Sequence, residues 1–424
     1  MVLNLAYGKT GLEIKVPEGP GVTVLQPDYV KGLANPQQEL RSALKSPVAS
    51  EPLKTLAKGA RKIGIIINDI SRATPYPVIL PAILEELKSV PDEDITLFIA
   101  LGTHRANSGQ ELEGILGDSM MKRFRVVQNS CEDRNTQVKT GVSSFENELW
   151  INREIYECDL KILTGFIEPH FFAGFSGGGK AILPGMAGLD SIMNNHSAEK
   201  IDHANATWGI TKGNPISEEI YEAAGTVENC FLVNVAMNRD KEITGVFAGD
   251  VVSAHGRGCE FVRAVAMVPV PRPFDIVITS NSGYPLDLNL YQSVKGMSAA
   301  AQVVREGGSI IVAADCWDGI PEHGLYGRLL RESESPDWLL KKIRAGGKNR
   351  RDQWQAQIQA KIQLKADVHI YSENLSEEQI RSALLKPVAS IENTVSRLLS
   401  RYGTGARICV LPEGPQTIPY IEKE

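Results

Sequence analysis

Residues 165–197 bring together side chains that could do chemistry. This segment reads GFIEPHFFAGFSGGGKAILPGMAGLDSIMNNHS and contains His170, Lys180 and His196. The lysine follows a Ser-Gly-Gly-Gly turn, and glycine allows the backbone to come close to a ligand. We therefore interpret the segment as part of an active or binding site.

Other reactive side chains follow the predicted strands. Residues 69–74 follow one strand, His104 follows a second, His170 a third, and residues 281–284 a fourth. Ligands of α/β folds bind outside the carboxyl ends of the strands. Residues 69–74 could instead cap the next helix, and His104 could be a hydrogen-bonded core histidine. Their joint placement favours a shared site.

The turn before Lys180 also matches the phosphate-binding pattern GxxxxGK. Ala181 stands where a nucleotide triphosphatase has the hydroxyl that binds Mg²⁺. The turn is also preceded by Phe171, Phe172 and Ala173 instead of directly by a strand. We therefore expect no triphosphatase, although glycine turns can still hold a phosphate through backbone N–H groups.

The composition is that of a globular protein. The chain has 424 residues, of which 42% are hydrophobic and 23% charged, which predicts two main domains. The net charge of −6 argues against binding to nucleic acid or to an anionic membrane. We find no apolar run long enough to span a membrane and no signal peptide, so we expect a cytoplasmic protein.

The cysteines do not form a recognisable framework. The six are spread singly, without a CxxC pair, which predicts free thiols and neither disulfides nor a thiolate zinc site. They are Cys131, Cys158, Cys230, Cys259, Cys316 and Cys409.

Short β-branched runs alternate with amphipathic stretches, which predicts mostly parallel sheets wrapped by helices. The proline-dense segment 269–273 can continue neither kind of element, so we place a domain boundary there. We expect an α/β fold with an N-terminal domain (1–268), a C-terminal domain (274–424) and an active site in the cleft between them. The predicted strands are 62–68, 95–101, 160–165, 231–236, 275–279, 309–313, 368–371 and 408–411, and the predicted helices are 77–90, 290–305 and 392–401.

Four motifs carry a resemblance to a known family. They are GFIEPHFFAGFSGGGKAILPG, NHS at 195–197, GYPLDLNLYQSVKGM at 283–297 and DQWQAQI at 352–358. Over nearly its whole length the chain resembles the nickel-pincer-nucleotide-dependent lactate racemase family. One departure is Gly179, where we would expect an arginine.

The resemblance implies a cofactor and a set of site residues. Lys180 would tether pyridinium-3,5-bisthiocarboxylic acid mononucleotide through a thioamide, and His196 would be the protein ligand of its nickel. Accessory proteins would make and insert this nickel pincer nucleotide. The resemblance assigns His104 and His170 to acid/base catalysis, Asp69, Ser71 and Tyr291 to the cofactor, and Arg72, Gln292, Lys295 and Trp354 to the substrate.

These residue types suit racemisation of a 2-hydroxy acid by hydride transfer. Removing the Cα proton would create a dianionic carbanion, whereas removing hydride leaves a planar 2-keto acid that can accept hydride on either face. Histidine can act as base and, once protonated, as acid at cellular pH. Arg72 can hold a carboxylate with a bidentate fork, and Lys295 can supply a point charge. A carboxylate at Asp69 suits the ribose hydroxyls of the cofactor.

Several alternatives stay open at this point. Arg72 and Lys295 could be solvated or form structural ion pairs, and Trp354 could be a core residue. The other histidines lack a motif, and we interpret His203, His255, His323 and His369 as structural or surface residues.

Two further questions stay open: which 2-hydroxy acid is the substrate, and whether the chain carries the cofactor. We expect lactate, but malate, a larger aliphatic or aromatic hydroxy acid, or a sugar acid would need the same chemistry. A hydrophobic pocket distinguishes one methylene by only about 1–3 kcal/mol, so these motifs do not fix the substrate. A binding protein of the same fold without the cofactor is the alternative from another class.

Overall fold

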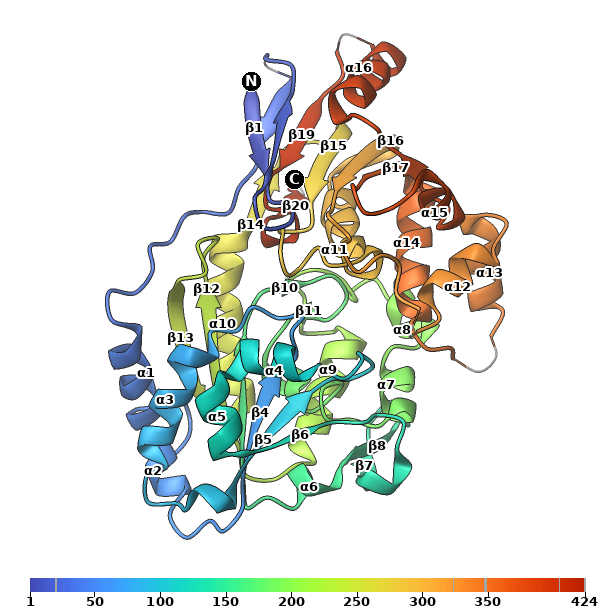
Figure 1. Cartoon of the computed structure of the whole chain (residues 1–424). Coiled ribbons are helices and arrows are strands. Elements are labelled where there is room, and N and C mark those ends of the chain that lie inside the picture. Colours follow the sequence, from blue (N-terminus) through green and yellow to red (C-terminus); the bar gives the residue numbers. More distant parts are fainter. Residues whose placement is uncertain (20, 323, 347–348, 404, 423–424) are drawn as a thin grey trace. The chain divides into compact units, whose positions relative to one another are not determined.

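The structure is a computed structural model, which describes residues 1–19, 21–322, 324–346, 349–403 and 405–422. The chain divides into two compact units (Figure 1). Unit 1 consists of Met1–Asp28, Ser197–Asp202 and Val265–Glu424, and unit 2 of Tyr29–His196 and His203–Ala264. Each unit is built on a mostly parallel sheet with helices, which confirms the predicted α/β class.

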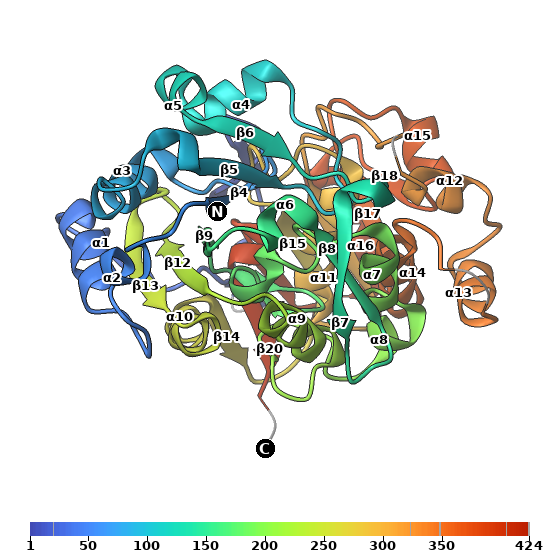
Figure 2. The same ribbon diagram turned by 90° about the horizontal axis from the view of Figure 1, so that it is seen from below.

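Unit 2 contains a six-stranded sheet in the order β13-β12-β9-β4-β5-β6. All neighbours are parallel except β12 and β13. Helices lie on both faces of this sheet (Figure 2), and Ile65 and Ile66, which point to opposite faces of β4, are both fully buried. The sheet strands are β4 (Ile63–Asn68), β5 (Ile95–Ala100), β6 (Arg125–Gln128), β9 (Leu160–Phe166), β12 (Cys230–Met237) and β13 (Ile243–Gly249).

The rest of unit 2 consists of helices and two antiparallel hairpins. The hairpins are β7 (Gln137–Val142) with β8 (Glu148–Asn152), and β10 (Pro169–His170) with β11 (Gly174–Phe175). The helices are α1 (Pro36–Lys45), α2 (Leu53–Leu56), α3 (Tyr76–Glu86), α4 (Gly109–Leu116), α5 (Asp118–Arg123), α6 (Arg153–Tyr156), α7 (Leu189–Asn195), α9 (Pro215–Gly225) and α10 (Val251–Ala266), the last of which runs to the unit boundary. Short 3-10 turns are η1 (Asp92–Asp94), η2 (Arg134–Thr136) and η3 (Gly178–Ala181).

Unit 1 contains a second six-stranded parallel sheet, in the order β18-β17-β16-β15-β19-β3. Its strands are β3 (Val22–Val24), β15 (Phe274–Ser280), β16 (Val304–Ala313), β17 (Ala366–Tyr371), β18 (Lys386–Pro387) and β19 (Ile408–Leu411). The hairpin of β1 (Val2–Leu5) and β2 (Leu12–Lys15) and the parallel pair of β14 (Met267–Val270) and β20 (Ile418–Ile421) complete the strands. The helices are α8 (Ala198–Asp202), α11 (Leu290–Ala301), α12 (Tyr326–Arg331), α13 (Pro336–Arg344), α14 (Gln353–Lys365), α15 (Glu377–Ser382) and α16 (Ile391–Tyr402), with a 3-10 turn η4 (Gly414–Gln416).

Helix α8 belongs to unit 1, although the residues on both sides of its segment belong to unit 2. Its backbone is held by α14, because Gln357 donates to the Ala198 carbonyl over 2.9 Å and Lys361 donates to the Ile201 carbonyl over 3.1 Å. These hydrogen bonds explain why this short segment belongs to unit 1.

The eight predicted strands are confirmed, seven of them to within two residues at each end, whereas β16 begins five residues before its predicted start. Three predictions about the extent of elements were wrong. The helix expected over 290–305 ends at Ala301, and the β-branched residues that follow enter β16. Pro269 lies inside β14, which tolerates proline because this two-stranded sheet leaves each strand with a free edge. The helix expected over 77–90 ends at Glu86, ahead of Pro91.

Two further expectations concern the membrane and the thiols. Within the described residues, no helix combines the length and the apolar character needed to cross a bilayer. All six cysteines carry free thiols, as predicted, and Cys230 is the half-buried one among them.

Candidate active site

The loops after β4 and β5 meet at Asp69 and His104. The two strands are parallel neighbours, so their carboxyl ends lie at the same edge of the sheet. His104 Nδ1 lies 2.6 Å from Asp69 Oδ2. An ionised carboxylate only accepts hydrogen bonds, so Nδ1 carries the proton and Nε2 is the basic nitrogen of the neutral ring.

Asp69 is held as an anion in this loop. Its side chain is buried, which alone would raise its pKa, but His104, Arg72 and Ser71 lower the pKa to about 2. Ser71 Oγ donates to Asp69 Oδ1 over 2.7 Å, and Arg72 Nη1 donates to Ser71 Oγ over 3.0 Å. The predicted residues Asp69, Ser71, Arg72 and His104 therefore form one connected cluster.

The two alternatives for these loops are not supported. The N-cap residue of α3 is Pro75, and within the described residues this helix end has no side-chain cap hydrogen bond. The side chain of His104 is 29% exposed, so it is not a core histidine.

A second cluster is gathered around the ring of Phe172. The His170 ring lies edge-on to it at 4.5 Å and the His196 ring at 5.0 Å between ring centroids. Lys180 Nζ lies 5.5 Å from the centroid of the same ring. The structure therefore brings three of the predicted site residues to one aromatic side chain, which the sequence interpretation did not assign to the site.

His170 lies in the β10–β11 hairpin and is buried. Its Nδ1 accepts a hydrogen bond from the backbone N–H of Ala173 over 3.3 Å. In the neutral ring the proton is therefore on Nε2, the opposite tautomer from that of His104.

Lys180 leaves a tight turn and is half-buried. Gly177 and Gly178 have φ angles of +79° and +58°, which favour glycine. The turn is linked to the His104 loop, because Gly185 donates to the Lys180 carbonyl over 3.0 Å and accepts from Gly102 N over 3.1 Å. Both clusters therefore lie on connected backbone at the carboxyl edge of the unit 2 sheet.

His196 is the residue that ends α7, and its imidazole is buried. Its backbone N–H donates to the Ile192 carbonyl over 2.9 Å. The preceding Asn195 donates to Glu219 Oε2 over 2.7 Å, and Glu219 is a fully buried carboxylate on α9. Glu219 is a second residue of this region that sequence reasoning missed, because it lies on another helix and in no motif.

The remaining predicted residues lie in unit 1. Tyr291, Gln292 and Lys295 are on α11, where Gln292 and Lys295 share a face. Trp354 is at the start of α14, 3% exposed, and its Nε1 donates to Tyr291 Oη over 3.1 Å. The structure therefore brings Tyr291 and Trp354 into contact. Trp354 is buried, and its role at the site stays a prediction.

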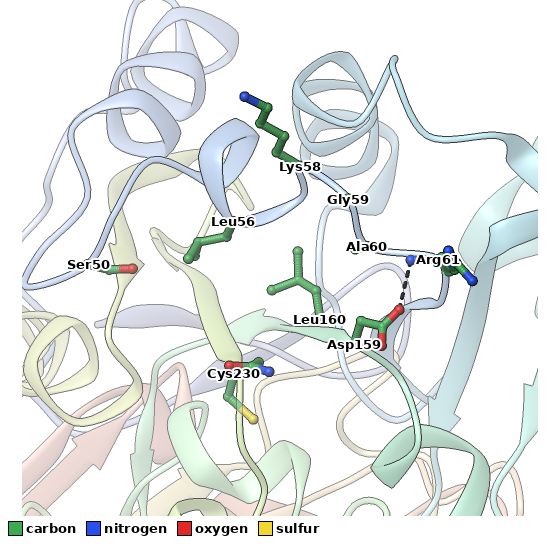
Figure 3. Close-up of a pocket in the computed structure, with 10 residues that line it drawn as sticks. Ser50, Leu56, Lys58, Gly59, Ala60, Arg61, Asp159, Leu160 and Cys230 are labelled. Carbon is green, nitrogen blue, oxygen red and sulfur yellow. Dashed lines mark hydrogen bonds between the residues drawn. The ribbon is translucent and has the colours of Figure 1, made fainter.

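A pocket of about 490 Å³ lies at the other edge of the unit 2 sheet, where β4, β9 and β12 begin (Figure 3). Arg61, Asp159 and Cys230 are among the residues that line it. The Asp159 carboxylate accepts hydrogen bonds from the backbone of Arg61 over 2.7 Å and of Lys62 over 3.1 Å. None of the predicted site residues lines this pocket. Among the described residues, no group of three or more His, Cys, Asp or Glu side chains is placed to hold a metal ion.

Comparison with known proteins covers both units. A family model described as the lactate racemase N-terminal domain matches residues 7–209, and one described as the lactate racemase C-terminal domain matches residues 270–418. A curated lactate racemase of Thermoanaerobacterium thermosaccharolyticum is 35% identical over 421 residues, which are 98% of each chain. The chain belongs to the lactate racemase family.

Two further similarities agree with this membership. The lactate racemase of Lactiplantibacillus plantarum is 35% identical over 418 residues, again 98% of each chain. The solved lactate racemase apoprotein of T. thermosaccharolyticum matches with a TM-score of 0.90 at 33% identity over the full length of both chains. A Thermotoga maritima protein matches at 18% identity with a TM-score of 0.69, covering 91% of this chain and 98% of the other, which shows a shared fold.

In this member of the lactate racemase family, packing explains the glycine before Lys180. A Cβ atom on Gly179 would lie 3.0 Å from the Ile220 carbonyl oxygen and 3.2 Å from the Ala224 Cβ. Helix α9 therefore leaves little room for a side chain at position 179. An arginine there would need the helix to move.

Proposed function

We propose that this chain is a nickel-dependent isomerase that racemises or epimerises a 2-hydroxy acid at C2, with lactate as the first substrate to test. What carries the proposal is the Asp69–His104 pair on backbone connected to the Lys180 turn, in a chain that matches lactate racemases over both of its units. The named relatives supply the choice of lactate.

His104 and His170 would move the hydroxyl proton of the substrate. With its proton on Nδ1, His104 has a free lone pair on Nε2 and can accept that proton. Asp69 would then stabilise the imidazolium that forms. Once protonated to the imidazolium, His170 can return a proton to the keto oxygen of the flattened substrate and become neutral again. This requires the 3.3 Å hydrogen bond from the Ala173 N–H to Nδ1 to open, because both ring nitrogens of an imidazolium carry protons. Each imidazole would serve one enantiomer, so in the reverse reaction His170 would be the base and His104 the acid.

The cofactor proposal rests on the donor types and on the shape of the turn. The half-buried amine of Lys180 would hold the nucleotide, and the imidazole nitrogen of His196 is a donor that suits nickel. Both side chains contact Phe172. When bound, the nickel pincer nucleotide would supply an acceptor for the C2 hydride. Asp69, Ser71 and Tyr291 are proposed as further cofactor contacts.

The substrate carboxylate would need fixed cations. We assign Arg72 to this role in unit 2, because its guanidinium is half-buried and is anchored through Ser71. From unit 1 we assign Gln292, Lys295 and Trp354 to substrate binding, on the family resemblance. Cofactor synthesis and insertion would be done by accessory proteins.

The experiment is co-expression with the cofactor-synthesis proteins of a known relative, followed by intact mass, nickel content and a racemisation assay. We expect one added nucleotide on the peptide that contains Lys180, about one nickel per chain, and interconversion of D- and L-lactate. Lys180→Ala should lose the added mass and the activity, whereas Lys212→Ala, at an exposed lysine of the same unit, should keep both.

Three results would overturn parts of this proposal. An unmodified wild-type chain argues for a binding protein without the cofactor. A Lys180→Ala chain with the full added mass contradicts the tether. A loaded chain that leaves lactate unchanged but racemises malate, a larger hydroxy acid or a sugar acid replaces the substrate and keeps the chemistry.

A further inference from the structure

The imidazole of His255, which has no assigned role, packs against the turn that precedes Lys180. His255 lies on α10 and is 3% exposed. Its Nε2 lies 2.7 Å from the carbonyl oxygen of Ser176, and its Nδ1 lies 2.8 Å from Tyr221 Oη. Tyr221 comes from α9, so two helices reach the turn through one imidazole.

These contacts fix the direction of the hydrogen bonds. A carbonyl oxygen only accepts, so His255 Nε2 carries the proton, and its Nδ1 accepts from the hydroxyl of Tyr221. Burial lowers the pKa of His255 to about 4, and the nearby charge of Lys180 acts in the same direction. The ring is therefore neutral at neutral pH, and the bonds run from Tyr221 to His255 to Ser176.

The glycine turn packs directly on this imidazole. A Cβ atom on Gly178 would lie 2.5 Å from His255 Nδ1, so only glycine leaves room for the ring. The backbone N–H of Gly178 donates to Asn234 Oδ1 over 2.8 Å. Helix α9 closes the third side, where Ile220 lies against Gly179. The turn is therefore held at residues 176, 178 and 179, immediately before Lys180.

We propose that Tyr221 and His255 are positioning residues, which hold the Ser176–Lys180 turn in the conformation from which the Lys180 amine bonds to the cofactor. The proposal rests on the proposed function, because it takes Lys180 as the tether. Neither residue needs to touch the cofactor. Their effect would pass through the Ser176 carbonyl and the turn backbone.

The covalent step is a condensation. The neutral Lys180 amine forms a C–N bond to a thiocarboxyl carbon, the carbon–oxygen bond breaks, and the oxygen leaves as water with two protons. The product is a thioamide, and no oxidant or reductant is consumed. A turn that samples several conformations would place the amine in the reactive geometry less often, and the condensation would be slower.

The test compares four variants with the wild type in the co-expression system. Tyr221→Phe removes only the hydroxyl, His255→Leu removes both ring nitrogens, and His255→Gln keeps an N–H that can reach Ser176. Tyr402→Phe is the control: it likewise removes a hydrogen-bonded hydroxyl, which lies 2.8 Å from Ser309 Oγ and donates to the Gly307 carbonyl over 3.1 Å, but it lies in unit 1. The readouts are the fraction of chains modified at Lys180 after a fixed time and the melting temperature of each apo chain.

We expect Tyr221→Phe and His255→Leu to lower the rate of Lys180 modification by about tenfold or more, the scale of one or two lost hydrogen bonds. His255→Gln should recover much of the rate, and Tyr402→Phe should load normally despite a similar loss of melting temperature. A long-range ¹H–¹⁵N spectrum of the apo chain should report the Nε2–H tautomer of His255.

The outcomes separate this inference from the function on which it rests. If the wild type remains unmodified, the proposed function fails and the inference falls with it. If the wild type loads and Tyr221→Phe and His255→Leu load equally fast, the inference alone is wrong. It is also wrong if loading follows the melting temperature in all four variants, or if the spectrum reports an Nδ1–H tautomer.

Discussion

Two buried histidines, His255 in unit 2 and His369 in unit 1, have the same exposure and different surroundings. Each side chain is 3% exposed, and burial lowers the pKa of each to about 4. His255 has hydrogen-bond partners on both ring nitrogens. Neither ring nitrogen of His369 has a hydrogen-bond partner among the described residues.

The surroundings of His369 are those of a sheet interior. It lies on β17, where it pairs with Ile311 of β16 and Lys386 of β18. After burial, the positive charges of Lys386, Arg397 and Arg401 lower its pKa further, while Asp367 raises it.

Burial and a depressed pKa therefore do not by themselves mark a functional imidazole. A hydrogen bond connects His255 to the turn that carries Lys180, whereas no hydrogen bond of the His369 ring to a described residue connects it to the site. We expect substitutions to have the largest effect at the groups most strongly connected to the site.

The largest effect is expected at the most strongly partnered imidazole, that of His104. Asp69→Asn keeps a hydrogen-bond acceptor for Nδ1 but removes the negative charge that stabilises the imidazolium. We expect kcat for racemisation to fall about 10²- to 10⁴-fold, the usual contribution of general acid/base catalysis. The measurement is the initial rate in both directions on chains whose Lys180 modification has been verified by mass.

Asp202→Asn is the control for this substitution, since Asp202 is an ion-paired carboxylate of α8 in unit 1. A loaded Asp69→Asn chain that racemises at the wild-type rate would show that the pairing of His104 has no catalytic role.

The second largest effect is expected from a substitution whose side chain would clash with the His255 ring. Gly178→Ala places a methyl group 2.5 Å from His255 Nδ1 at a φ of +58°, so it adds a clash to backbone strain. We expect a loss of about 3 kcal/mol in the free energy of unfolding, from strain and overpacking together, and slower Lys180 modification. Denaturant titration measures the first effect and intact mass the second.

The matched control is Gly114→Ala, in helix α4, where an added Cβ meets no described atom outside the helix's own backbone within 4 Å. It should stabilise the chain by about 0.5–1 kcal/mol. Equal effects of the two substitutions would mean that the turn tolerates a side chain, which would weaken the case for His255 as its support.

The sequence was sufficient to predict that Asp69 and His104 share an edge of the sheet. The apolar runs before them predicted parallel strands, and the carboxyl ends of neighbouring parallel strands meet. The tautomer of His104 could not be predicted, because it depends on a 2.6 Å contact between two loops. The ends of α11 and β14 were missed because local propensity does not report how neighbouring strands pair.

His255 shows what motif reasoning leaves out. It lies far along the chain from Lys180, on a helix without any recognised motif, so the sequence offered only a structural or surface interpretation. The one available signal was the run of glycines at 177–179, since consecutive glycines indicate a turn with positive φ angles or a close packing partner. The partners that do so, on α9 and α10, appear only in the fold. His203 is exposed, as a surface residue should be, and His323 lies outside the described residues.

Protonation of His369 should make the free energy of unfolding depend on pH. Its folded pKa of about 4 is below the unfolded value of 6.5, so the unfolded chain takes up a proton first as the pH falls. Stability is therefore lost between pH 6.5 and pH 4. His369→Leu should remove this contribution, which amounts to about 2 kcal/mol at pH 5.

The measurement is the free energy of unfolding of both chains from pH 7.5 to pH 4.5. The variant should be at least as stable at pH 7, fall less steeply with acid, and racemise at the wild-type rate when loaded. A variant that keeps the wild-type pH slope would show that His369 is partnered in solution. One that loses activity would show that His369, like His255, supports the site.

The smallest effect on stability is expected for an ion pair whose side chains are exposed to solvent. Arg344 of α13 donates to Asp202 of α8 over 2.7 Å, yet its side chain is 51% exposed, and Lys361 lies 3.1 Å from the same carboxylate. Arg344→Ala should therefore cost less than about 1 kcal/mol, and less still in 1 M salt, because water and ions screen exposed pairs. Arg344→Lys, measured by the same denaturant titration, separates lost charge from lost geometry. A cost as large as that of Gly178→Ala would mean that partners stabilise without burial, and the distinction between His255 and His369 would then need a different explanation.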